Sequence, residues 1–374
     1  MEFTKERISS SLLTEDNYVS TENMLQDFQG VTIAHNIPEG TNVMEYRQGD
    51  VLVSNIRPYL KKVWMADKDG GCSADVFVMR ANKNICTGDF LCHIVANDHF
   101  IGYVMSGAKG VKMPRGDKEQ MKGYATALPS LKEQQKVAHL LAIIDERITT
   151  QIRIIAQLQS LMTGLNNYLM DNPSWEKVRV GDFMDFYSTN SLSWEQLDYN
   201  QGEVKNLHYG LIHSGLPTLI DCRTSALPNI KNEFLPKQYT LCKDGDVAFA
   251  DASEDTNEVG KTVEIINCRK QSIVCGLHTI HGRDKANATI VGFKGFAFNA
   301  KYFHDQLRRI SQGSKIYSIS TDNIKSCYLR IPPKSEQEKI VRLLNAYLQK
   351  IEIAEQTLKA YHVQKQYLLK ALFV

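Results

Sequence analysis

The chain contains one long segment twice. Residues 128–165 and 331–368 align without a gap through most of their length, at an offset of 203 residues (331 − 128). The identical pairs include Pro129 and Pro332, Glu133 and Glu336, Gln134 and Gln337, and Lys136 and Lys339. A single period of about 200 residues indicates a duplicated half-molecule, because solenoid repeats are much shorter. With 374 residues, the chain is long enough for two such halves.

Each copy of the segment predicts a long helix that begins after a proline. Apolar residues recur at alternating spacings of four and three, and they hold nine of ten positions in each copy, over more than four heptads. This period is typical of a coiled-coil seam, so we expect the two helices to pack against each other as an antiparallel pair. The seam residues that we single out are Val137, Leu141, Ile144, Ile148, Ile155, Ile340, Leu344, Tyr347, Ile351 and Leu358.

The remaining sequence divides into two domains of mixed α and β character. Short alternating apolar runs are separated by glycine, asparagine and aspartate, which is the pattern of many short strands. Gly49-Asp50 and Gly245-Asp246 each lead into an apolar run, at a related offset of 196 (246 − 50). We therefore predict an α+β protein with pseudo-two-fold duplication. Its parts are a first domain at 1–128, a central helix at 129–170, a second domain at 171–332 and a C-terminal helix at 333–374.

Clusters of polar and basic residues in both domains suit contact with DNA. Arg, Asn and Ser side chains can pair with base edges, whereas Lys mostly contacts phosphates. In the first domain the candidates are Asn55, Arg57, Lys61, Lys109, Lys112 and Arg115. In the second domain they are Asn206, His208, Arg308, Lys315 and Tyr317. Each cluster taken alone is also what an ordinary solvated surface looks like.

Composition excludes several other classes of protein. No apolar run approaches the roughly 20 residues of a membrane helix, and the first residues lack the apolar core of a signal peptide, so we expect a cytoplasmic protein without membrane contact. The formal net charge is +2, which neither requires nor excludes a nucleic-acid partner.

Eight cysteines occur without a Cys-x-x-Cys pair, so free buried thiols are expected. Cys275, His278 and His281 have a spacing that could hold a metal, but they lie in an alternating run, and ordinary strand residues with no metal are the preferred interpretation.

Catalytic motifs are also missing. Gly260-Lys261-Thr262 would end a phosphate-binding loop, but that motif needs glycine at position 255, where this chain has Asp255. The segment Asp171-Asn-Pro-Ser-Trp175 is similar to an amino-methyltransferase motif but lacks its second proline, and no glycine-rich cofactor loop precedes it. We therefore predict a non-catalytic chain.

Together these features resemble the specificity subunit of type I restriction–modification enzymes. The resemblance rests first on the two helix starts, Leu-Pro-Ser-Leu-Lys-Glu-Gln at 128–134 and Ile-Pro-Pro-Lys-Ser-Glu-Gln at 331–337. It rests also on Trp175-Glu-Lys-Val-Arg-Val-Gly-Asp182, which is similar to the opening of the family's target recognition domains. Segments 18–24 and 204–210, the second of which contains Asn206 and His208, also resemble parts of such domains. The first domain departs from the pattern because it starts without a Trp-containing opening.

The resemblance implies a function. Two target recognition domains would each read one half of a split DNA site, and the helices would space them and dock two modification (methyltransferase) subunits. Restriction subunits would join to cleave DNA. S-adenosylmethionine, ATP and Mg²⁺ would then bind to partner subunits, with no cofactor in this chain. Two alternatives stay open, a coiled-coil scaffold that binds proteins only and a single-chain restriction enzyme.

Overall fold

The computed structural model describes residues 2–110, 112–255, 258–269, 271–311, 313 and 316–372. The contacts within it divide the chain into two compact units. The first comprises Met1–Arg153 together with Gln356–Val374, and the second comprises Ile154–Glu355. No helix among the described residues is long and apolar enough to cross a membrane.

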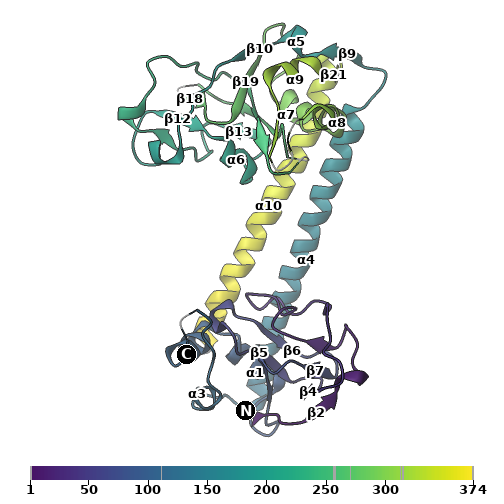
Figure 1. Cartoon of the computed structure of the whole chain (residues 1–374), viewed down its shortest axis with the longest axis vertical. Coiled ribbons are helices and arrows are strands. Elements are labelled where there is room, and N and C mark those ends of the chain that lie inside the picture. The colour runs from purple at the N-terminus through teal and green to yellow at the C-terminus, as the bar shows by residue number, and fades with distance from the viewer. Residues whose placement is uncertain are drawn as a thin grey trace. The chain divides into compact units, whose positions relative to one another are not determined.

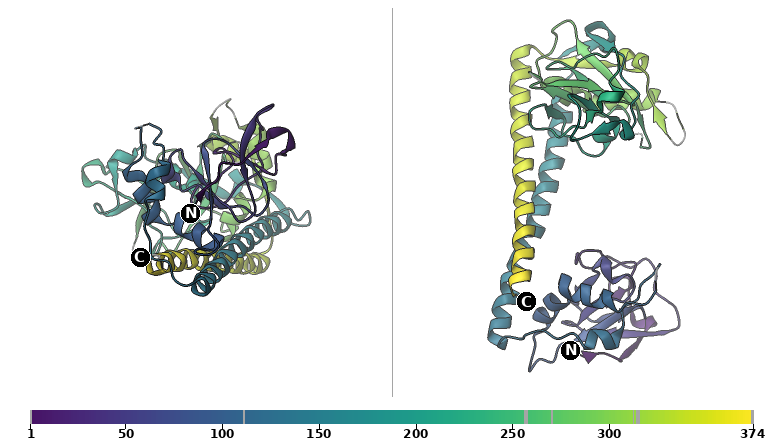
Figure 2. Two further views of the ribbon diagram at one scale, coloured as in Figure 1. Left: turned by 90° about the horizontal axis from the view of Figure 1, so that it is seen from below. Right: turned by 90° about the vertical axis from the view of Figure 1, so that its left-hand side faces the viewer.

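Two long helices each contribute to both units. Helix α4 spans Leu131–Met170 and helix α10 spans Lys334–Leu372. The first unit holds the start of α4 and the end of α10, where Asp145 and Lys365 form an ion pair. The second unit holds the end of α4 and the start of α10, and Figures 1 and 2 show the two helices side by side within each unit. The predicted α+β class with its antiparallel helices is confirmed.

The heptad positions of both helices face inward. On α4, all ten positions from Val137 to Leu169 are buried or half-buried, and on α10 the same holds from Ile340 to Leu368, with the last position, Leu372, exposed. In the second unit, Ile340 and Leu344 belong to the main apolar core, against which Met162, Leu165 and Leu169 also pack. The four-three spacing thus places one stripe of each helix in an apolar environment, as a coiled-coil seam requires.

The first domain consists of two four-stranded sheets with helices against one of them. The sheet orders are β1-β8-β5-β6 and β2-β4-β7-β3. The strands are β1 (Glu2–Phe3), β2 (Arg7–Ser9), β3 (Tyr18–Val19), β4 (Asn42–Tyr46), β5 (Val51–Ser54), β6 (Val63–Met65), β7 (Gly70–Cys72) and β8 (Val76–Arg80). The helices are α1 (Gly88–Val95), α2 (Asp98–Ser106) and α3 (Lys118–Lys122), and the 3-10 turn η2 covers Pro58–Leu60. The apolar faces of α1 and α2 pack on β5 and β8, together with Leu141 of α4.

The second domain repeats this plan. Its sheet β10-β19-β15-β17-β13 corresponds to β1-β8-β5-β6 with one added strand, and its sheet β11-β14-β12-β18 includes a parallel pair, β12 and β18, that corresponds to β3 and β7. The strands are β10 (Met184–Tyr187), β11 (Leu197–Asp198), β12 (Val204–Leu207), β13 (Leu219–Asp221), β14 (Asn229–Ile230), β15 (Val247–Ala250), β16 (Ala252–Ser253), β17 (Thr262–Ile266), β18 (Ser272–Cys275), β19 (Thr279–Asp284) and β20 (Tyr317–Ser318). The helices are α5 (Val180–Phe183), α6 (Tyr209–His213), α7 (Phe293–Phe298), α8 (Lys301–Ile310) and α9 (Thr321–Ser326), and Figure 1 labels most of these elements.

A forked ion pair fixes the same strand junction in both domains. Asp50 accepts two hydrogen bonds from Arg80, at 2.8 and 2.7 Å, and Asp246 accepts two from Arg283, at 2.8 and 2.6 Å. Both carboxylates are buried, and a bidentate pair of this kind is among the stronger charge-assisted interactions. The repeated Gly-Asp of the sequence is therefore a structural clamp that holds β5 to β8 and β15 to β19.

The two domains differ where the chain enters them. In the second domain, β9 (Glu176–Arg179) pairs antiparallel with β21 (Tyr328–Ile331), the strand that leads into α10. Residues 125–128, which match β21 at the offset of 203, lie in no strand. The segment that follows Trp175 thus supplies a strand to the second domain.

Candidate nucleic-acid interface

In the first domain, two segments far apart in the sequence form one paired surface, which we call the first loop pair (residues 55–57 with 114–116). The backbone N–H of Arg57 donates to the carbonyl of Pro114 at 2.8 Å, and that of Gly116 donates to the carbonyl of Asn55 at 2.8 Å. Isolated bridges join Ile56 to Arg115 and Arg115 to Lys109. The structure thus brings together Asn55, Arg57, Lys109 and Arg115, with Lys112 on the turn between the last two.

The basic side chains on the first loop pair, and those beside it at Lys109 and Lys112, are accessible. The Lys109 side chain is 84% exposed and lies 3.4 Å from Asp117, and Arg115 reaches Asp75 at 2.9 Å while remaining 55% exposed. Arg57 and Lys112 are exposed and form no ion pair within the described part of the chain. Cations that are solvated or only weakly paired can reach phosphates and base edges without a large desolvation cost.

Arg57 also occupies an unusual backbone conformation. Its φ is 50° and its ψ is 61°, the left-handed region that non-glycine residues rarely adopt, at a cost of about 1–2 kcal/mol. The hydrogen bond from Arg57 N–H to Pro114 holds it there. Strain of this kind is frequent at ligand-binding loops, where surrounding contacts hold the side chain in a set direction.

Asn55 and Lys61 are less accessible than the other candidates. Asn55 is buried, and its side-chain Oδ1 has no hydrogen-bond partner among the described residues. Lys61 is half-buried beside η2, and its ammonium lies 2.6 Å from Asp98 at the start of α2. Lys61 therefore also ties η2 to α2.

The second domain builds the same surface from residues 251–253 and 317–319, the second loop pair. Strand β16 pairs with β20, so that Ser253 lies opposite Tyr317 and Ala252 opposite Ser318. The N–H of Ile319 donates to the carbonyl of Asp251 at 2.9 Å, which repeats the bond from Gly116 to Asn55. Ile319 and Gly116 are separated by the same offset of 203 (319 − 116).

Equivalent positions of the two loop pairs carry different chemistry. Asn55 corresponds to Asp251, because each follows the matched strand, β5 or β15. Their N–H groups donate to the carbonyls of Asp75 (2.9 Å) and His278 (3.1 Å), which are therefore also equivalent. Arg115 corresponds to Ser318 at the offset of 203. The first domain thus carries Asn55, Asp75 and Arg115 at the positions where the second domain carries Asp251, His278 and Ser318.

Asp251 and His278 form a side-chain pair on the second loop pair. His278 Nδ1 lies 3.1 Å from Asp251 Oδ1, and about half of the His278 side chain is exposed. Burial raises the pKa of Asp251, and the neighbouring His278 opposes this rise. His278, which lies beside the second loop pair, has a φ of 53° and is likewise a non-glycine residue in the left-handed region. Its exposed imidazole can offer a ring nitrogen to a base edge or a phosphate.

The other candidates of the second domain are dispersed. Tyr317 lies on β20 with its ring half-buried against the core, and Arg308 is exposed on α8, where it pairs with Asp305 at 3.1 Å. Lys315 lies outside the described residues. Asn206 and His208 are only 0% and 2% exposed. Their burial excludes them from the accessible surface of this conformation.

Asn206 and His208 have structural partners instead. Asn206 donates to Asn190 at 3.0 Å from the middle of β12, and its other amide atom, Oδ1, has no hydrogen-bond partner among the described residues. His208 caps α6 by accepting from the N–H of Gly210, and its ring lies 4.4 Å from that of Trp194. Burial lowers the pKa of His208, which favours the neutral imidazole that this cap requires.

Asp75 and Asp251 were not singled out from the sequence, and His278 was named only as a possible metal ligand. A signal for them was present, because His278 lies 203 residues after Asp75 and Asp251 lies 196 residues after Asn55, the same offsets that relate the helices and the Gly-Asp pairs. Comparing the two halves position by position would have found both sets.

Comparisons with known proteins support this architecture. The sequence model of the family described as type I restriction modification DNA specificity domain matches residues 5–160 and 172–360. The chain belongs to this family. A curated relative, the type I restriction enzyme EcoDI specificity subunit of Escherichia coli, is 26% identical over 123 residues, which cover 33% of this chain and 26% of that protein. The chain thus matches only about a quarter of the length of this relative.

Solved structures share the fold. A chain from a study of complex assembly and conformational transition of the type I R-M system has a TM-score of 0.63 at 19% identity, over 95% of this chain and 90% of that one. The type I restriction-modification system S subunit from M. genitalium has a TM-score of 0.57 at 14% identity, over 100% of this chain and 94% of that one.

Proposed function

We propose that this member of the specificity family is the DNA-reading subunit of a type I restriction–modification complex. Each domain would contact one half of a bipartite DNA site, the first through residues 55–57 and 114–116 and the second through residues 251–253 and 317–319. The observation that carries this proposal is the repeated backbone of the two loop pairs with different side chains at equivalent positions. A shared frame with divergent chemistry suits two modules that read different sequences, because base readout depends on the donors and acceptors presented in the groove.

Partner subunits would complete the complex. The helices α4 and α10 would dock two modification subunits and set the distance between the half-sites, and restriction subunits would join them. S-adenosylmethionine, ATP and Mg²⁺ would be bound by those subunits in the cytoplasm. This chain alone would then transfer no methyl group, and methyl transfer from labelled S-adenosylmethionine by the highly purified chain would contradict the assignment.

The decisive experiment exchanges side chains between the loop pairs. In the complex with modification subunits, Arg115→Ser would give the first loop pair the residue that the second has there. We expect weaker binding by about 1–3 kcal/mol and relaxed preference in one half-site only. Asp251→Asn should change the other half-site. Arg7→Ser, an exposed site on β2, is the control and should leave both halves unchanged.

The alternatives predict other outcomes. Binding and half-site preference unaffected by both loop-pair variants would remove these loops from the interface. A protein-only scaffold would show no salt-dependent DNA affinity even with modification subunits present. Changes in both half-sites from a single variant would contradict modular reading.

A further inference from the structure

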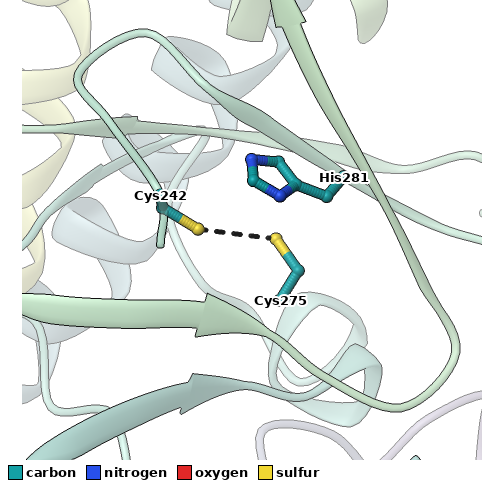
Figure 3. A group of neighbouring side chains, drawn as sticks. All are labelled: Cys242, Cys275 and His281. Carbon is teal, nitrogen blue, oxygen red and sulfur yellow. Dashed lines mark hydrogen bonds between the residues drawn. The ribbon is translucent and has the colours of Figure 1, made fainter. Parts of the chain in front are cut away.

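Three side chains of metal-binding type meet in the core of the second domain. Cys242 lies just before β15, Cys275 ends β18 and His281 lies within β19, and all three are buried. They form the one group of at least three His, Cys, Asp or Glu ligand atoms close enough to share a metal ion in the described part of the chain. Figure 3 shows the two sulfur atoms facing each other, with a nitrogen of the His281 ring on their side.

The spacing of the sulfurs suits tetrahedral zinc. Cys242 Sγ and Cys275 Sγ are 3.7 Å apart, and the three ligand atoms all lie within 4.8 Å of one another. Zn–S bonds of about 2.3 Å at the tetrahedral angle place two sulfurs about 3.8 Å apart. Bonds of about 2.0–2.1 Å from zinc to nitrogen place the nitrogen about 3.6 Å from each sulfur, so the imidazole nitrogen needs to approach by at most about 1.2 Å. A small side-chain rotation covers that distance.

His281 is oriented as a ligand would be. Its Nε2 lies 2.8 Å from Asp246 Oδ2, so a proton on Nε2 leaves the lone pair of Nδ1 free for a metal. Arg283 holds the same carboxylate through two hydrogen bonds. A carboxylate behind a histidine is the usual support of metal-binding imidazoles, since it sets the tautomer and the ring orientation.

The first domain shows that the fold itself does not require these residues. Cys275 and His281 correspond to Cys72 and Val78 at the offset of 203. Cys242 corresponds to Tyr46. The N–H of Cys242 bonds to the carbonyl of Ile273, and Tyr46 pairs with Gly70, which lies 203 residues before Ile273. The set Tyr46, Cys72 and Val78 forms an apolar core cluster. The equivalent ion pair between Asp50 and Arg80 is present in the first domain too. The ion pair between Asp246 and Arg283 therefore does not by itself require a histidine at position 281.

We propose that Cys242, Cys275 and His281 of this chain bind one Zn²⁺ ion, with water as the fourth ligand. Both thiols would release their protons, and two thiolates would then neutralise the charge of the ion, which makes the buried site neutral overall. The segment between Cys275 and His281 carries His278, so the ion would also fix the turn that presents His278 on the second loop pair. The metal site does not depend on the proposed DNA function.

The second domain also offers a matched control. Cys222 and Cys268 form another close thiol pair, with sulfurs 3.3 Å apart and no histidine in a metal-binding group with them among the described residues. A general affinity of paired thiols for metal would involve both pairs. A specific site would involve only the pair beside His281.

The test measures metal content and cobalt spectra of the full chain. Protein purified under reducing conditions in the presence of Zn²⁺ and then freed of loose metal should retain about one ion per chain. Cys242→Ser and His281→Val, the second of which installs the residue of the first domain, should lose it, whereas Cys222→Ser should keep it. Co²⁺ in place of Zn²⁺ should give the thiolate charge-transfer absorption and strong visible bands of a tetrahedral site.

Several outcomes would overturn the proposal. One is a wild-type chain that retains no zinc. Another is a zinc content of Cys242→Ser and His281→Val equal to that of the wild type. Loss in Cys222→Ser to the same degree would assign the metal to thiols in general. Should Cys242→Ser and His281→Val fail to fold, the cobalt spectra of the wild type and of Cys222→Ser decide, because the absence of thiolate charge transfer from either one excludes ligation by Cys242 and Cys275.

Discussion

Gln134 and Gln337, 203 residues apart, each tie the start of a long helix to the domain before it through three hydrogen bonds. Gln134 accepts from the N–H of Thr87 at 3.0 Å and donates to the carbonyls of Ile85 and Pro129, both at 2.9 Å. Its side chain is fully buried. A single amide thus satisfies three backbone groups that would otherwise lose their partners.

The second copy repeats this arrangement. Gln337 accepts from the N–H of Ile290 at 2.8 Å and donates to the carbonyls of Ala288 and Pro332, at 3.0 and 2.9 Å. The repeated Glu-Gln of the sequence therefore has a structural cause, because the glutamine anchors the helix to its domain.

We expect Gln134→Leu and Gln337→Leu to be strongly destabilising. Each removes three hydrogen bonds and leaves buried backbone groups unsatisfied, so the free energy of unfolding should fall by about 2–5 kcal/mol. Denaturant unfolding of the full chain measures this. Gln135→Ala, an exposed neighbour on α4, should change stability by less than about 0.5 kcal/mol. Equal effects of Gln134→Leu and Gln135→Ala would refute the anchoring role.

Lys109→Ala should weaken DNA binding without regard to sequence. The side chain is almost fully exposed beside the first loop pair, where it can reach a phosphate. Loss of one phosphate contact lowers the slope of log K against log salt concentration by about one. Titrations at several salt concentrations measure this slope, and Lys83→Ala, exposed in the turn after β8, is the control. A slope identical to the wild type would place Lys109 away from DNA.

His93 should make the protein less stable at acidic pH. Burial lowers the pKa of His93 to about 4, although Asp145 opposes this shift. The unfolded chain takes up the proton near pH 6.5, so stability is fully present above about pH 6.5 and is lost as the pH falls toward 4, by at most about 3 kcal/mol. His93→Gln should therefore show a shallower fall in unfolding free energy over this range. Parallel curves for both proteins would rule out His93 as the source.

Lengthening both helices should change the preferred spacer of the DNA site. Seven residues inserted after Arg153 and after Glu355 preserve the heptad seam and add roughly 10 Å of helix, which matches about three base pairs. Binding to the native site should fall sharply while circular dichroism shows intact helices. We expect affinity to return on a site with a longer spacer. A folded variant that binds the native site as tightly as before would show that the helices do not set the distance.

Individual residues show how far the sequence alone could lead. The seam from Val137 to Leu169 was predicted because a repeat of 3.5 residues is visible along the chain itself. The accessible cations Arg57, on the first loop pair, and Lys109, beside it, were also named. Asn206 and His208 were named as polar residues of a segment that resembles target recognition domains, and that resemblance does not reveal their buried contacts with Asn190 and Trp194.

The sequence by itself determined the duplication, the two long helices and the α+β class, because each depends on periodicity or identity between residues near one another or at one constant offset. Only the tertiary structure decided which distant residues meet. Asp251 and His278 are brought together by the pairing of β15 with β19, and Cys242, whose N–H bonds to Ile273 of β18, meets His281 of β19 in the core. Such contacts depend on strand order and register, which are set by long-range hydrogen bonds and by burial of the two sheets, and no local pattern in the chain encodes them.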